Sequence, residues 1–409
     1  MKLSVLRMGA AAAALIGMSC TVALAVAPAS ASPATIQQER TAGAAWMGAH
    51  ATNHEWKLVT QFAVSGQHSA STWTSSEISN LQTTTDYARF ILGLLAAGLD
   101  PHNYQGKNYV QALAKEQQTS GDNEGKFADN MDGTGFDQVN AQVWSIIALE
   151  AAGNASYNRA SAAAWLISHQ NKDGGFGWSA SSTDSDPDDT AYALDALSLL
   201  GYTKDSQVVS RALQYLQTQQ APDGGFGSAD NSNSDSTAVV VEALEALGIN
   251  PDSWVQKNGV PSTALTSYFD KSSGGFVYDH SGQSWSGVNE TSTRDALFGL
   301  SALATHQSVY QRLHWKRLDW LNTYWSKVYQ QGGAWLNGHF LTFAELRPMA
   351  VAGSYVSDLT PAWQKVVKAR GMYVQKNGKK VWEAWDVHLA TQALVDSFGQ
   401  DTAHLNGLA

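Results

Sequence analysis

Apolar runs that end in glycine recur along the chain. Leu194 and Leu197 in one run return as Val241 and Leu244 in the next, a spacing that suits a buried helix. The final glycine accepts the left-handed backbone that ends a helix. The clear runs cover residues 85–98, 140–153, 188–201 and 235–248, a fifth copy lies at 293–300, and weaker copies lie at 343–353 and 386–398. The pattern predicts one helix that is repeated along the chain.

Another helix is predicted before several of these runs, at residues 161–169, 211–219 and 262–270. Between the two helices of a unit lies a glycine-rich loop, and the loops at 170–177 and 220–227 both read Gln-x-x-Asp-Gly-Gly-Phe-Gly. A helix pair of this size cannot bury its faces alone, so the units must stack on one another. We therefore expect an all-α protein, an α/α toroid of six to seven helix pairs. An open solenoid is the alternative.

Around these loops the residues resemble the QW motif of squalene and hopene cyclases. Arg211, Gln220, Gly224 and Phe226 match the motif along their unit, whereas Ser161 departs from its basic position in the unit before. The resemblance is best over residues 80–305. It implies the α/α-toroid fold of terpenoid cyclases, protein prenyltransferase β subunits and cobalamin carriers.

The physical sense of the motif is local to the scaffold. A glutamine such as Gln170 or Gln220 can bond backbone groups of a neighbouring loop or helix end that would otherwise be unsatisfied. The glycine pair permits a tight turn with positive φ, and the aromatic side chain fills the seam between units. The motif therefore says more about shape than about activity.

The first residues have the character of a secretory signal. Lys2 and Arg7 form a basic segment before an apolar run over residues 8–26. Residues 29–31 read Ala-Ser-Ala, which suits cleavage. We expect residues 1–31 to be removed, residues 32–409 to form a single toroid domain, and the protein to be secreted. No later stretch is long and apolar enough to span a bilayer.

Cleavage would remove the only cysteine, so the core must hold the fold without disulfides. It would also remove two of the 26 basic residues and none of the 36 acidic ones, which leaves a net charge of −12. Such acidity disfavours nucleic acid as a partner. Few charged residues and 15 tryptophans suit a heavily buried helical scaffold or a surface that stacks on sugars.

An acidic cluster opens the third repeated helix. Residues 186–191, Asp-Pro-Asp-Asp-Thr-Ala, resemble the Asp-x-Asp-Asp-Thr-Ala motif of class II terpene cyclases. The resemblance implies that Asp188 is the acid that protonates an alkene or epoxide. Clustered carboxylates in an apolar site raise one pKa above the others, and Asp186 and Asp189 would supply that coupling.

Helix capping is the alternative explanation of the same residues. The next unit reads Asn-Ser-Asp-Ser-Thr-Ala at 233–238, so Asp235 takes the place of Asp188 without the flanking acids. Asp is a good N-cap residue, and acids are favoured at a helix N-terminus. Capping would explain Asp188 and Asp235 together and would leave the case for chemistry to Asp186 and Asp189.

Metal sites have little support in the sequence, and we expect no cofactor. Asp184, Asp186 and Asp188 alternate like calcium ligands, but Asp189 and Asp195 stand where an EF-hand needs Gly and Glu, so only a loose calcium site remains open. The mature chain lacks the cysteine that would hold zinc in protein prenyltransferases. His50 and His54 lack the Glu between them that a zincin motif requires, and a solvated helix end explains them.

If the inner helices run parallel, their N-termini open on one face and bring polar groups to one mouth, which is the default place for a ligand. Aromatic side chains on the same helices would line the interior. The residues expected there are Asp86, Arg89, Asn140, Trp144, Tyr192, Asp235, Arg294, Phe298, Glu345, Asp386 and His388.

Three functions follow from this arrangement. The first is binding of an apolar, isoprenoid-like ligand in the centre of the ring. The second is a class II terpene cyclase that uses Asp188 as general acid. The third is a secreted polysaccharide-active enzyme, in which Asp188 and Glu345 would be the carboxyl pair for glycoside cleavage. The corresponding partners are a small apolar ligand or a component of the cell envelope, including polysaccharide.

Overall fold

Twelve α-helices alternate between an outer and an inner layer in the part of the chain that the computed structural model describes: residues 28–153, 157–228 and 231–313, with four short strands beyond. The outer helices are α1 (Pro33–His50), α3 (Ser75–Ser79), α5 (Tyr109–Ala114), α7 (Arg159–Ser168), α9 (Gln207–Gln219) and α11 (Pro261–Ser267). The inner helices are α2 (His54–Ser65), α4 (Thr84–Ala96), α6 (Val139–Ala152), α8 (Pro187–Leu199), α10 (Ser234–Ala246) and α12 (Glu290–Thr305).

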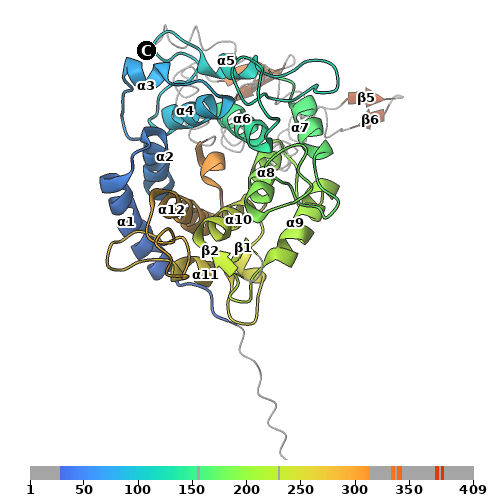
Figure 1. Cartoon of the computed structure of the whole chain (residues 1–409). Coiled ribbons are helices and arrows are strands. Elements are labelled where there is room, and N and C mark those ends of the chain that lie inside the picture. The colour runs from blue at the N-terminus through green and yellow to red at the C-terminus, as the bar shows by residue number, and fades with distance from the viewer. Residues whose placement is uncertain are drawn as a thin grey trace, which may run out of the picture.

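Each inner helix packs against the next, and α12 packs against α2, so the six pairs close into a ring (Figure 1). This confirms the predicted α/α toroid and excludes the open solenoid. The pair α1 and α2, which carries no Gly-Gly-Phe loop, supplies the partner that α12 needs. The region that the inner helices surround, where their inward side chains lie, is called the lumen below.

Strands are few and short. β1 (Phe226–Ser228) pairs with β2 (Asn231–Asn233) as an antiparallel hairpin just before α10, and a 3-10 turn, η1, covers Pro251–Ser253. Two more antiparallel pairs follow: β3 (Gly333–Leu336) with β4 (His339–Thr342), and β5 (Val374–Lys376) with β6 (Lys379–Val381). The weak helical copies at 343–353 and 386–398 lie outside the described residues, so a single domain over 32–409 stays a prediction.

The glycine-rich loops are held by the side chains that the motif pointed to. The amide of Gln170 donates to the carbonyl groups of Gly174 and Val208, both at 2.8 Å, and Gln220 bonds the next loop in the same way. A threonine in the first turn of α8, α10 and α12 adds a second tie to the loop before the helix. In α8, Oγ1 of Thr190 accepts from the amide of Phe176 at 2.9 Å, and Thr237 and Thr293 do the same in α10 and α12. The phenylalanine rings of these loops are fully buried, as expected for residues that fill the seams.

One end of the lumen is filled by a helical turn after α12, residues 309–313, seen in orange inside the ring of Figure 1. The buried ring of Tyr310 packs edge-on against Trp144, with 5.6 Å between ring centroids. The amide of Val309 donates to Oε1 of Glu242, and Arg312 donates to the carbonyl of Ala63 near the end of α2. These contacts lie toward the C-terminal ends of α2 and α10, so the turn is at the end of the ring opposite the N-termini of these helices.

Candidate functional site

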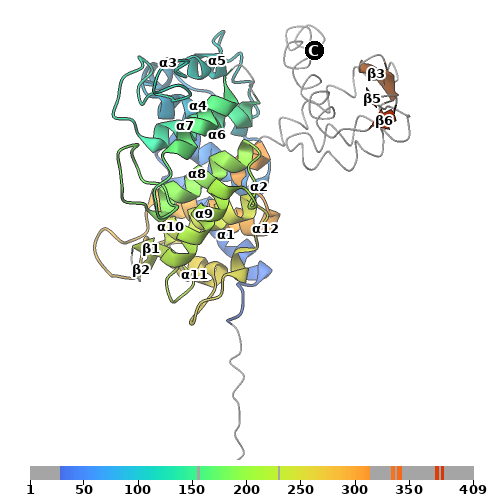
Figure 2. The same cartoon turned by 90° about the vertical axis from the view of Figure 1, so that its right-hand side faces the viewer.

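The N-termini of the inner helices lie at one mouth of the ring, and hydrogen bonds between neighbouring loops run along its rim. Glu290 at the start of α12 accepts from the amide of Thr52 at 2.8 Å, before α2. The amide of Val139 donates to the carbonyl of Trp178, and that of Ser234 donates to the carbonyl of Tyr278. The loops before α8, α10 and α12 project from the same side in Figure 2, at its left. The structure therefore has the single mouth that parallel inner helices predict.

Asp186, not Asp188, caps α8. Oδ1 of Asp186 accepts from the amide of Asp189 at 2.9 Å, and Asn233 and Asn289 cap α10 and α12 in the same way. The interpretation of Asp188 and Asp235 as caps was wrong, because an N-cap side chain bonds the third helical residue and must stand outside the helix. Pro187 at the first helical position marks the same boundary.

Asp188 therefore stands free of the capping role, in the first turn of α8. Its Oδ1 is buried and has no hydrogen-bond partner among the described residues. Burial raises the pKa of this carboxyl to about 7; the Ser236 hydroxyl opposes the shift, and the carboxylates of Asp186, Asp235 and Asp295 add to it. A sizeable protonated fraction at neutral pH follows.

Two neighbouring acids are perturbed in the same direction. Burial and the adjacent Asp186 carboxylate raise the pKa of Asp189 to about 8. Burial and the Asp295 carboxylate raise the pKa of Asp235 to about 6, although hydroxyls of Ser292 and Ser234 oppose it. The start of α8 and α10 is thus a place where carboxyl groups lie close together and hold protons more tightly than usual.

Aromatic rings continue from this acid cluster into the lumen. Tyr192 lies one turn after Asp188, and its ring centroid is 5.1 Å from that of Trp144. Trp144 also contacts Trp56 at 5.4 Å, and Trp56 lies 6.3 Å from Phe298. Trp56, Trp144 and Tyr192 are half-buried. Together these rings and Phe298 form an apolar wall, called the aromatic wall below.

Arg294 stands between the acids and the aromatic wall. Its guanidinium makes two bonds to Asp295, at 2.7 and 2.9 Å, and lies over the Trp56 ring at 5.1 Å from the centroid. The Asp295 carboxylate holds the pKa of Arg294 above its usual range although burial opposes it. Arg294, one of the two arginines predicted at this mouth, is therefore already paired with a carboxylate of its own helix.

Two further acids lie about two helical turns farther along α8 and α10 than Asp188 and Asp235. Asp195 and Glu242 are buried, and both oxygens of Asp195 and Oε2 of Glu242 lack partners within the described residues. Burial raises the pKa of Asp195 well above its usual range and that of Glu242 to about 8. The sequence held a signal for them: each stands seven residues after Asp188 or Asp235, on the same helix face, inside an apolar run.

The remaining predicted residues fall into three sets. Asp86 and Arg89 pair with each other at 2.8 Å, and Arg89 also reaches Glu55 at 3.4 Å, so they form a separate ion-pair network between α2 and α4. Asn140 stands half-buried in the first turn of α6. Glu345, Asp386 and His388 lie outside the described residues, and so the carboxyl pair of Asp188 with Glu345 stays a prediction.

Sequence reasoning missed Trp56 and Tyr310. Neither belongs to a unit with a recognisable loop motif: Trp56 is in the first inner helix and Tyr310 follows the last. Their only signal was their size, because a large aromatic ring in a helical ring protein has few places other than a seam or the lumen.

Metal chemistry has no support in this region. In the ranges that the structure describes, no three His, Cys, Asp or Glu side chains gather as a set that could hold a metal ion. A loose calcium site at Asp184, Asp186 and Asp188 remains a prediction from the sequence. Among the same residues, no helix has both the length and the apolar character needed to cross a bilayer.

Comparison with known proteins gives a family match and distant structural likenesses. The model of the prenyltransferase alpha-alpha toroid domain matches residues 61–271. Among solved structures, the Candida albicans protein geranylgeranyltransferase-I complexed with GGPP aligns with TM-score 0.47 and 16% identity, over 69% of this chain and 93% of that one. A type II terpene cyclase from Scytonema in complex with geranylgeranyl dihydroxybenzoate aligns with TM-score 0.37 and 12% identity, over 68% and 87%. No curated protein matches the chain.

Proposed function

The chain belongs to the prenyltransferase α/α-toroid family, and from this premise we propose that it binds an apolar, isoprenoid-like ligand in its lumen. The observation that carries the proposal is the aromatic wall of half-buried Trp56, Trp144 and Tyr192 at the start of the lumen. Rings that are partly accessible below a polar mouth offer apolar area to a ligand whose polar end stays at the rim.

Charge restricts the head group of such a ligand. Asp188, Asp235 and Asp295 meet at the mouth, and the nearby Arg294 is paired with Asp295. A diphosphate placed there would face carboxylates in a poorly solvated site, where like charges repel strongly. The proposal is therefore an uncharged ligand, such as a prenyl alcohol or hydrocarbon.

Binding is tested by titrating the purified protein with farnesol and geranylgeraniol and following tryptophan fluorescence and native mass spectra. Hexadecanol serves as a straight-chain control and farnesyl diphosphate as a charge control. We expect Trp144→Ala to weaken prenyl alcohol binding at least about tenfold, because it removes a large part of the apolar contact area. Val255→Ala is the control: this side chain is 50% exposed and follows η1, beyond the C-terminal end of α10, so affinity should be unchanged. Equal binding by Trp144→Ala and the wild type would overturn the proposal.

Proton-initiated cyclisation is the second candidate, and one observation favours it. The buried Oδ1 of Asp188 has no partner, and its carboxyl retains a proton near neutral pH. Asp188 would give that proton to an alkene carbon, and the aromatic wall would shield the carbocation until a proton is lost again. Incubation with squalene and geranylgeraniol, followed by mass spectrometry for isomers of unchanged mass, tests this. Asp188→Asn should abolish any such product and keep binding, whereas a wild type that yields none removes the candidate.

Export remains part of the proposal. Ser32 caps α1, its side chain accepting from the amide of Thr35 at 3.1 Å, so cleavage after Ala31 would leave the helix and its cap complete. N-terminal sequencing of the protein from culture medium and from cells provides the test. A medium fraction that begins at Ser32 supports export, and an uncleaved chain confined to cells contradicts it.

A further inference from the structure

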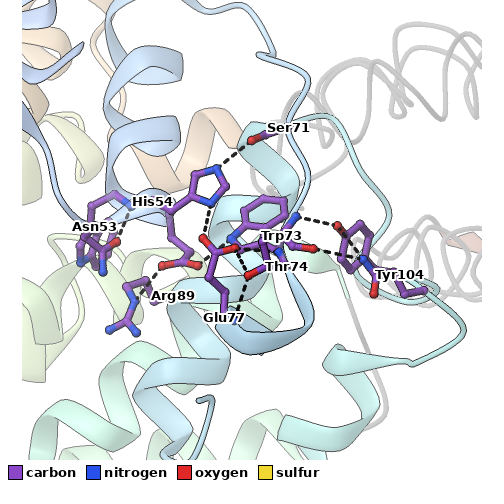
Figure 3. A network of polar contacts seen from close by, with 11 residues as sticks. Asn53, His54, Ser71, Trp73, Thr74, Glu77, Arg89 and Tyr104 are labelled. Carbon is purple, nitrogen blue, oxygen red and sulfur yellow. Dashed lines mark hydrogen bonds and ion pairs between the residues drawn. The ribbon is translucent and has the colours of Figure 1, made fainter. Parts of the chain in front are cut away.

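His54 at the start of α2 lies between a serine and a carboxylate. Its Nε2 is 2.7 Å from Oγ of Ser71, and its Nδ1 is 3.0 Å from Oε1 of Glu77 (Figure 3). The three residues come from α2, the connection after it and α3, so no local motif announces the arrangement. The order of the atoms is that of a serine nucleophile, an imidazole base and a carboxylate that orients the base.

Hydrogen-bonding capacity decides which imidazole nitrogen carries the proton. Oε2 of Glu77 accepts from both the amide and the hydroxyl of Thr74, each at 2.7 Å. These Thr74 bonds lower the pKa of Glu77, so its carboxylate is ionised and can only accept. Nδ1 of His54 must then be the donor to Glu77. In the neutral ring this leaves Nε2 as an acceptor for the Ser71 hydroxyl, which is the tautomer that a general base needs.

The imidazole is also fixed in orientation. Its ring stacks on Trp73 with 4.7 Å between centroids. Trp73 is held in turn, because its Nε1 donates to Oε1 of Glu55 at 2.7 Å and its amide donates to the hydroxyl of Tyr104 at 3.2 Å (Figure 3). A base held by packing and by supporting hydrogen bonds keeps its geometry through a reaction.

Solvent exposure and a donor for a developing oxyanion are present beside the serine. Ser71 is half-buried and Thr72 is exposed, so a substrate can approach. The amide of Thr72 makes no hydrogen bond within the described residues. The amide that follows a nucleophilic serine is a usual oxyanion donor. His54 makes these contacts outside the lumen, whereas Trp56, two residues on, packs inside it.

We propose that Ser71, His54 and Glu77 form a second, hydrolytic site on the rim, with small carboxylic esters as its substrate class. Oγ of Ser71 attacks the ester carbonyl while its proton passes to Nε2 of His54. The alcohol then leaves with that proton, and Ser71 keeps the acyl group. Water attacks the acyl-serine, gives a proton to His54, and the carboxylic acid leaves as Ser71 recovers its hydrogen. The overall reaction converts one ester and one water into one carboxylic acid and one alcohol, so it needs no further reactant.

The direct test is covalent labelling of the full-length protein with a fluorophosphonate probe, with the labelled peptide identified by mass spectrometry. Label on Ser71 supports the proposal, and label elsewhere or none overturns it. This measurement uses the unmutated chain and so does not depend on any variant folding. Because the lumen is not involved, its outcome is separate from that of prenyl alcohol binding.

Hydrolysis of p-nitrophenyl acetate and butyrate provides the second measurement. Ser71→Ala should lose labelling and turnover, whereas Ser75→Ala, an exposed serine at the start of α3, should keep both. Glu77 is a positioning residue: Glu77→Gln can still serve the Thr74 cap, yet it should lower kcat at least about 100-fold with KM unchanged, because the amide no longer fixes the imidazole tautomer. An unchanged kcat in Glu77→Gln would mean that the three residues are only a structural hydrogen-bond network between α2 and α3.

Discussion

Asp186 and Asp188 are two residues apart at the start of α8, and their carboxyl groups face different surroundings. Asp186 accepts the amide of Asp189 and is thereby fixed at the end of the helix. Asp188 has no such bond for its buried Oδ1 and meets Asp235 and Asp295 instead. The contrast follows from helix geometry, since the cap lies outside the helix and the next turn of side chains projects toward the neighbouring inner helix.

The raised pKa of Asp188 makes a prediction about stability. Its ordinary value of 3.8 applies to the unfolded chain, whereas the folded chain keeps the proton up to about pH 7. The folded state therefore binds more protons between these values, and its stability falls as pH rises through this window. Asp188→Asn removes the effect. Relative to the wild type, the variant should gain stability between pH 4 and pH 8, by up to about 4 kcal/mol.

Urea unfolding of both proteins at the two pH values measures this gain. Asp184→Asn is the matched control, because Asp184 is an exposed acid of the preceding loop. A difference between wild type and Asp188→Asn that does not change with pH would show that the carboxyl is not desolvated in solution.

The candidate site was predictable where it repeats. Equivalent places of successive inner helices hold Asp188 and Asp235, and likewise Trp144 and Tyr192. Comparing the units therefore places these residues at one mouth. The distinction between cap and lumen residue was not predictable from Asp-x-Asp-Asp alone, since both positions favour acids for different reasons. The triad of Ser71, His54 and Glu77 was beyond reach because its members depend on how three separate segments pack.

Glycines at the ends of the helices and in the loops serve two different purposes: some allow a neighbouring backbone to approach closely, and others only allow a positive φ. Gly174 has φ +98°, and a Cβ built there would lie 2.4 Å from the carbonyl oxygen of Arg211 on the next outer helix. Gly201 has a similar φ of +91°, but nothing lies within 4 Å of its Cβ position. The first glycine serves packing between units, and the second serves only the turn that ends α8.

Alanine at these two positions should therefore have unequal effects. Gly201→Ala strains the left-handed backbone alone and is expected to cost about 1 kcal/mol. Gly174→Ala adds a clash with backbone that cannot rotate away, so we expect a loss of about 3 kcal/mol or more. Thermal and urea unfolding of the two variants give the comparison. Equal losses would mean that the loop moves aside and that the seam between units is softer than the contacts indicate.

The fold as a whole was largely predictable, because the helix pair, its glycine end and its loop glutamine recur with little change. The loop bonds of Gln170 and Gln220 are the ones that the motif suggested. What the repeat did not provide was the ring's closure. The closing helices α1 and α2 lack the Gly-Gly-Phe loop, and only their packing against α12 identifies them as a unit of the toroid.

Closure also depends on the turn after α12, which joins the walls of the lumen from inside. Tyr310 is fully buried there and contacts Trp144 on α6 and Phe298 on α12, while neighbouring residues of the same turn bond α2 and α10.

Tyr310→Ala should open a cavity between four inner helices and lower the free energy of unfolding by about 3–5 kcal/mol, the usual cost of removing a large buried ring. Phe136→Ala removes a ring that is 84% exposed and should cost almost nothing. Urea unfolding and tryptophan emission measure both variants, and a red shift in Tyr310→Ala alone would report water entering beside Trp144. A variant as stable as the wild type would mean that the Tyr310 ring does not help to hold the inner helices together.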